Sequence, residues 1–110
     1  MEWATDGRGR FPAEEFFQSL SKGEQAQMLA LFQRLADEWR IVNREHFKSL
    51  GGGLWEFKKF QLRFLGGYRS GYRFLTAHGL RKKKDKHSPV DIETVRRILR
   101  ENDEAEEREQ

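Results

Sequence analysis

The sequence predicts an α+β fold, with N-terminal helices packed on an antiparallel sheet of three to four strands and a C-terminal helix alongside. The apolar residues recur first at helical spacing, then at strand spacing, and finally at helical spacing again. The chain has 110 residues, of which three are Trp and nine are Phe, enough to bury one core between two layers. We therefore expect a single domain over residues 1–102, followed by a flexible acidic tail over residues 103–110.

The N-terminal region predicts a short strand and a short helix. Residues 2–5 are a candidate for the fourth strand of the sheet. Pro12 suits the first position of a helix, where its missing N–H removes no hydrogen bond. Phe16, Phe17 and Leu20 would form the buried side of that helix.

A longer helix follows and is the clearest element of the sequence. Ser21 and Glu24 have the spacing of a capping box, in which each side chain satisfies a backbone N–H at the helix start. An apolar stripe then continues along one side, which indicates a face buried in the core. The stripe consists of Met28, Phe32, Leu35, Trp39 and Val42.

The second half of the chain predicts strands and a last helix. Residues 48–53 are predicted to be a loop ending in three glycines, after which the apolar period falls to about two residues. Three antiparallel strands are expected at residues 54–58, 62–65 and 72–77, with turn residues at 66–67 and 70–71. Ser88 and Pro89 then suit the start of a helix whose apolar face is Ile92, Val95, Ile98 and Leu99.

Several common classes of site lack support in the sequence. There is no cysteine, and His46, His78 and His87 lack the spacing of a metal site. A phosphate-binding glycine loop is also missing, so we expect neither a metal nor a cofactor. No apolar run is long enough to span a membrane, and we expect a cytoplasmic protein without a membrane partner.

The most informative stretch runs from residue 58 to residue 86 and holds ten basic residues and one acid. Aromatic and aliphatic residues at strand spacing are threaded through it, so a sheet would hold the cations in fixed positions. Strand alternation predicts Lys59, Gln61 and Arg63 on one face and Phe60, Leu62 and Phe64 in the core. The basic residues are Lys58, Lys59, Arg63, Arg69, Arg73, Arg81, Lys82, Lys83, Lys84 and Lys86.

A fixed array of cations suits a polyphosphate such as RNA. RNA carries its own nucleophile, the 2′-OH, and clustered Lys and Arg stabilise the charge that develops on the phosphate. A histidine, or a lysine whose pKa neighbouring cations lower, can move the protons. The residues alone leave three interpretations open: metal-independent RNA cleavage, phosphate binding without chemistry, and solubility.

Four motifs give the chain a resemblance to the RelE/HigB-like toxins of bacterial and phage toxin–antitoxin pairs. They are Phe-Pro-Ala-Glu-Glu-Phe-Phe at 11–17, Gly-Leu-Trp-Glu-Phe-Lys at 53–58, Gln-Leu-Arg at 61–63 and Thr-Ala-His-Gly-Leu at 76–80. A lysine-rich segment that leads to a helix starting with Pro89 completes the pattern. The resemblance covers most of the chain.

The resemblance implies a RelE-like fold and an endoribonuclease that cleaves mRNA, in many members on the ribosome. It also implies a cognate antitoxin, often a small helix-turn-helix protein. By position, Arg63 would contact the scissile phosphate, Lys82 and Lys83 would bind RNA or stabilise charge, and His78 would transfer a proton. The remaining candidates for RNA binding are Lys58, Lys59, Arg73, Arg81, Lys84 and Lys86.

Two other functions fit the same fold. One is a non-catalytic module that docks its basic face on ribosomal RNA. The other is a degenerate toxin that acts through antitoxin binding.

Overall fold

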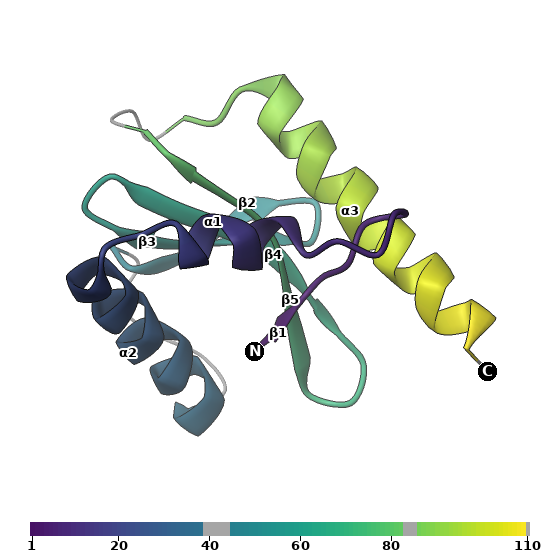
Figure 1. Ribbon diagram of the computed structural model, residues 1–110, viewed down its shortest axis with the longest axis horizontal. Coiled ribbons are helices and arrows are strands. Elements are labelled where there is room, and N and C mark those ends of the chain that lie inside the picture. The colour runs from purple at the N-terminus through teal and green to yellow at the C-terminus, as the bar shows by residue number, and fades with distance from the viewer. Residues whose placement is uncertain (39–44, 83–85, 110) are drawn as a thin grey trace.

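The computed structural model describes residues 1–38, 45–82 and 86–109, which form three helices and one five-stranded sheet. The strand order across the sheet is β1-β5-β4-β3-β2 (Figure 1). The elements are β1 (Glu2–Trp3), α1 (Pro12–Gln18), α2 (Lys22–Glu38), β2 (Phe47–Gly51), β3 (Leu54–Lys59), β4 (Leu62–Arg69), β5 (Arg73–Arg81) and α3 (Pro89–Arg108).

The sheet is mixed and has more strands than the sequence predicted. The antiparallel meander β3–β4–β5 is confirmed, and β1 joins it at the edge, but in parallel with β5. The prediction of a loop at 48–53 was wrong, because β2 pairs with β3 there. Only the end of that segment turns, where Gly51, Gly52 and Gly53 all adopt positive φ angles of 87°, 60° and 82°.

Helices cover both faces of the sheet. Helices α1 and α2 pack on one face through a core rich in Phe, which includes Phe32, Phe57 and Phe64. Helix α3 packs on the other face through aliphatic residues such as Leu65 and Ile98. The predicted apolar faces are confirmed at Met28, Phe32 and Leu35 in α2 and at Val95, Ile98 and Leu99 in α3, whereas Trp39 and Val42 lie outside the described residues.

The predicted turn at Gly66-Gly67 was also wrong, since both residues lie inside β4. The strand needs a glycine at 66 because a Cβ there would come within 1.9 Å of the Leu75 carbonyl oxygen. The close approach coincides with a β-bulge, at which β5 has one residue more than β4. After the bulge, the side chains of β5 alternate in the opposite sense. The consecutive residues Ala77 and His78 therefore both point toward α3.

The face predictions around residue 60 need correction as well. β3 ends at Lys59 and β4 begins at Leu62, so Phe60 and Gln61 form the turn between them. Phe60 is therefore exposed and is not part of the core. Residues paired across two strands share a face of the sheet. Arg63 is paired with Lys58, and Lys59 is paired with Leu62. Lys59 and Arg63 therefore lie on opposite faces.

The acidic C-terminal segment continues α3 as far as Arg108 and pairs with cations of the sheet. Asp103 forms an ion pair with Arg69 of 2.9 Å, and both Glu106 and Glu2 pair with Arg73. The hydrogen bond from Arg73 lowers the pKa of Glu106 to about 2 and also lowers that of Glu2. These contacts join α3 to β4, β5 and the N-terminus. The division of the chain at residue 102 stays a prediction.

We expect the contact between Arg73 and Glu106 to weaken in acid. A carboxylate whose pKa is lowered on folding stabilises the protein above its unfolded pKa of 4.5, and the contribution is lost as the pH falls toward 2. Glu106→Gln should therefore reduce stability at neutral pH, by less than about 1 kcal/mol because the pair is half-exposed. The same substitution should also make the free energy of unfolding depend less on pH between 4.5 and 2. Urea unfolding at several pH values measures this dependence. Glu107→Gln is the matched control, and an equal effect from both variants would refute the assignment.

Candidate functional site

Polar residues gather on the α3 face of the sheet, beyond the N-terminus of that helix. Two rows of paired residues cross the strands there, as the sheet register shows. We call the ionisable residues of these rows, together with Lys82, His87 and Asp91, the polar site. The first row is Lys48, Glu56, Leu65 and His78, and the second is Lys58, Arg63 and Leu80.

A buried histidine–carboxylate pair lies at the centre of the polar site. Glu56 on β3 is 0% exposed, and the segment between β5 and α3 brings His87 over it so that His87 Nε2 contacts Glu56 Oε2. The His87 side chain is only 2% exposed. Lys48 Nζ lies 3.9 Å from the other oxygen of Glu56. A carboxylate this deeply buried requires such partners, because its desolvation is unfavourable.

Lys82 extends the pair toward the surface. Its Nζ lies 3.4 Å from His87 Nδ1 and also contacts the Lys86 carbonyl oxygen. An ammonium group can only donate, so Nδ1 accepts and the ring proton is assigned to Nε2, which donates it to Glu56. The result is a chain from the buried carboxylate through the imidazole to a half-exposed lysine.

A second histidine–carboxylate pair lies at the β5 end of the first row. His78 Nε2 is 3.1 Å from an oxygen of Asp91, in the first turn of α3. Ser88 caps this helix, as predicted, by accepting the Asp91 N–H and donating its own O–H to the Asp91 carboxylate. Burial acts to raise the pKa of Asp91, but the hydrogen bonds from His78 and Ser88 outweigh it, so the pKa lies below its usual value.

Arg63 lies beneath the surface between the two pairs. The residue is 2% exposed, and its Nη1 donates to the carbonyl oxygens of Phe60 at 2.6 Å and Leu62 at 3.0 Å. The guanidinium therefore fixes the turn between β3 and β4. The phosphate contact expected of Arg63 stays a prediction.

The comparison with protein families gives a match over most of this fold. The family model of phage-derived Gp49-like proteins (DUF891) matches residues 15–100. The chain belongs to this Gp49-like family. The family is of the RelE/HigB toxin-like type, so the resemblance is confirmed at that level. No curated protein matches the chain.

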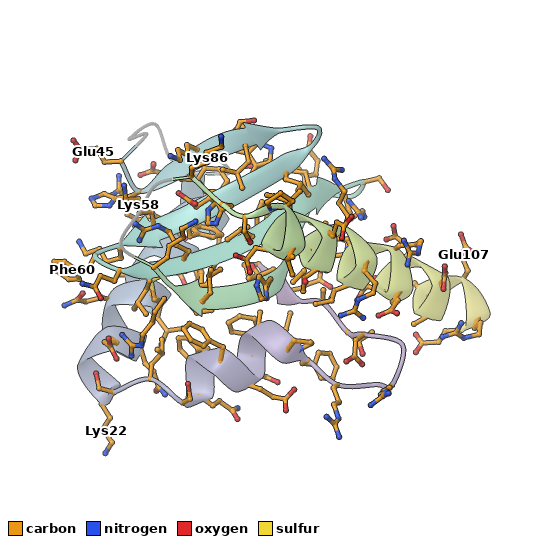
Figure 2. The ribbon with its side chains drawn as sticks, turned by 90° about the horizontal axis from the view of Figure 1, so that it is seen from above. Lys22, Glu45, Lys58, Phe60, Lys86 and Glu107 are labelled. Atoms are coloured by element: carbon orange, nitrogen blue, oxygen red, sulfur yellow. The ribbon has the colours of Figure 1, made fainter. Side chains whose placement is uncertain are left out.

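The structure separates the predicted basic residues of this Gp49-like chain into two groups. Arg63, His78, Lys82 and Lys58 lie in the polar site, and Lys59 and Lys86 lie at the same end of the sheet. Figure 2 shows Lys58 and Lys86 there with Phe60. Arg73 lies toward the other end, where it is opposite Arg69 in the sheet register. Lys83 and Lys84 fall outside the described residues.

Arg81 is also turned away from the polar site. It lies on the α1/α2 face and forms two hydrogen bonds with Glu24 of α2, at 2.7 and 2.9 Å. The hydrogen bond from Arg81 lowers the pKa of Glu24 to about 2. Arg81 and Arg73 are thus both held by carboxylates of the fold.

Sequence reasoning missed Glu56, His87 and Asp91 as functional candidates. One indication was present, because Glu56 shares a strand face with Leu54 and so places a carboxylate where alternation predicts burial. The histidines were set aside as metal ligands because they are far apart in the sequence, and only His78 was kept as a candidate for proton transfer. The register brings His78 into one row with Glu56, and the segment after β5 brings in His87.

Residues 1–38, 45–82 and 86–109 hold neither a membrane-spanning helix nor a metal-binding cluster. None of the helices there is long and apolar enough to cross a membrane. Within the same ranges, no group of three or more His, Asp and Glu side chains could hold a metal ion.

The Glu56–His87 pair should show strong coupling in folding stability. Replacing either residue with Leu leaves its partner buried without its counterpart, which should lower the free energy of unfolding by about 3 kcal/mol. The double variant should lose much less stability than the sum of the two single variants, because it contains neither the unpaired carboxylate nor the unpaired imidazole. Urea unfolding measures the cycle, and the exposed pair Arg100–Glu104, at 3.7 Å, is the control, with coupling below about 0.5 kcal/mol. Additive losses at Glu56 and His87 would contradict this account.

Proposed function

We propose that this Gp49-like protein is the toxin of a toxin–antitoxin pair of the RelE/HigB type. In this proposal it is a metal-independent endoribonuclease that cleaves mRNA, on the ribosome, and so inhibits translation. The observation that carries the proposal is the pair of histidine–carboxylate contacts at Glu56 and His78, which lie two strands apart in one row of the sheet. Family membership supports the toxin class and implies a cognate antitoxin, for which we propose a small helix-turn-helix protein.

The proposed reaction uses the 2′-OH of the RNA as nucleophile. Asp91 holds His78 through Nε2, which leaves Nδ1 to accept the 2′-OH proton while the 2′-oxygen bonds to phosphorus. Lys82, which contacts His87 and the Lys86 carbonyl oxygen, donates a proton to the 5′-oxygen as the bond between that oxygen and phosphorus breaks. The products are a 2′,3′-cyclic phosphate and a 5′-hydroxyl, so atoms and protons balance.

The geometry is compatible with these roles. Glu56 and His78 are separated by one strand, so their Cα atoms lie about 10 Å apart, which leaves room for a phosphodiester between the groups they hold. The His78 side chain is 20% exposed, so solvent and substrate can reach it. Lys58 and Lys86 add positive charge nearby, and Arg63 adds a cation from below, which favours the charged transition state.

One observation favours a non-catalytic function as the second candidate. Three charged or titratable members of the site, Glu56, Arg63 and His87, are almost fully buried, as residues that only stabilise a fold would be. The same basic surface would then dock on RNA or the ribosome without cutting it, or the protein would act through antitoxin binding alone.

Substitution of the two half-exposed residues separates these functions. His78→Ala and Lys82→Ala should each lower the rate of RNA cleavage by about 100-fold or more, because each removes a proton-transfer group. For His78→Ala, RNA affinity should fall much less than the cleavage rate, because the lysines and arginines that contact phosphate remain. Cleavage of end-labelled RNA in a translating extract gives the rate, and product analysis should find the 2′,3′-cyclic phosphate.

The control is Lys22→Ala, an exposed lysine on α2 at a distance from the polar site (Figure 2). It removes one positive charge, as Lys82→Ala does, and should leave cleavage unchanged. Intact mRNA in the presence of the wild-type protein would reject the enzyme and leave the docking function.

A further inference from the structure

We propose that Phe60 is a stacking platform for a nucleobase of single-stranded RNA, at the edge of the polar site. The proposal rests on the proposed function only in taking RNA as the ligand. It concerns binding, so it can be tested separately from cleavage.

The backbone at Phe60 gives the first argument. Phe60 is the first residue of the two-residue turn between β3 and β4, and its φ angle is 53°. This left-handed conformation favours glycine or asparagine and is unfavourable for a bulky side chain. The turn itself therefore does not explain a phenylalanine at this position.

The surroundings of the ring give the second argument. Phe60 is 71% exposed and belongs to neither apolar core of the described residues. A cation lies beside the ring, because Lys59 Nζ is 5.4 Å from its centroid. A strained position that presents an aromatic ring to solvent points to an external partner.

The turn is held firmly and joined to the polar site. Arg63 Nη1 donates to the Phe60 carbonyl oxygen at 2.6 Å, and the Lys82 backbone N–H donates to the Gln61 carbonyl oxygen at 2.8 Å. The two residues of the turn thus each accept a hydrogen bond from a residue of the polar site. A ring on such a support keeps its place relative to Lys82, as a stacking surface requires.

The chemistry of the surface selects the ligand. Exposed aromatic rings among cations are typical of proteins that bind single strands, since bases stack on the ring and phosphates contact the lysines. Figure 2 shows Phe60 at one end of the sheet, on the same side of the molecule as Lys58 and Lys86. A duplex would not offer the face of a base to this ring. Stacking predicts little sequence preference at this position, because every base has an aromatic face.

The test measures binding of a short 2′-O-methyl oligoribonucleotide, which lacks the nucleophile and cannot be cleaved by 2′-OH attack. Phe60→Ala should weaken binding about 10-fold, and Phe60→Trp should retain it. A second probe has the same number of phosphates but abasic residues. Wild type and Phe60→Ala should bind that probe equally, because only the stacking is lost.

Two further variants exclude a merely structural role. Phe60→Asn fits the positive φ angle and should fold at least as stably as wild type, yet it should bind as weakly as Phe60→Ala. Tyr72→Ala removes the other exposed aromatic residue with positive φ, in the turn at the opposite end of β4, and should leave binding unchanged.

The outcomes separate this proposal from the enzymatic one. Binding without cleavage by wild type would reject the nuclease and leave the stacking site in place. Equal binding by wild type and Phe60→Ala, or an equal loss with the abasic probe, would overturn the stacking site even if cleavage is found. Loss of antitoxin binding by Phe60→Ala, with unchanged oligonucleotide binding, would assign the ring to a protein interface instead.

Discussion

The contact between Glu56 and His87 is the interaction on which the rest of the polar site depends. It links the segment after β5 to β3, two strands away, and so fixes where α3 starts and where Lys82 lies. Since the carboxylate is fully buried, it is stable only with a hydrogen-bonded or charged partner, and this requirement holds His87 against the sheet. An apolar pair could fill the same volume, but it would not orient Lys82.

Ion pairs elsewhere in the fold neutralise part of the basic segment, so that the remaining cations are concentrated around this site. The carboxylates of α2, α3 and the N-terminus hold Arg81, Arg69 and Arg73, which lie outside the polar site. The basic segment that looks continuous in the sequence is thus divided by the fold. Part of its charge stabilises contacts between elements, and part remains around the row that joins Glu56 to His78.

The sequence predicts the elements of this fold better than the site. Periodicity identifies α2, α3 and the strands of the meander, because burial imposes the period directly. It cannot reveal the bulge in β5, and without that extra residue His78 would face α1 and α2, as Phe74 does. Nor can it place His87, whose position depends on a contact with Glu56 far away in the sequence. Phe60 was assigned to the core since alternation does not show where a strand ends.

The residues of the polar site differ in burial, and burial separates residues that position other groups from residues that can reach a substrate. The buried members, Glu56, Arg63 and His87, are covered by their neighbours and are suited to holding other groups in place. The half-exposed members, His78 and Lys82, each contact a held partner and reach the surface. Residue type alone would make Arg63 the strongest phosphate ligand of the site. Its burial, and its bonds to the turn that carries Phe60, instead favour a role in positioning the groups that meet the RNA.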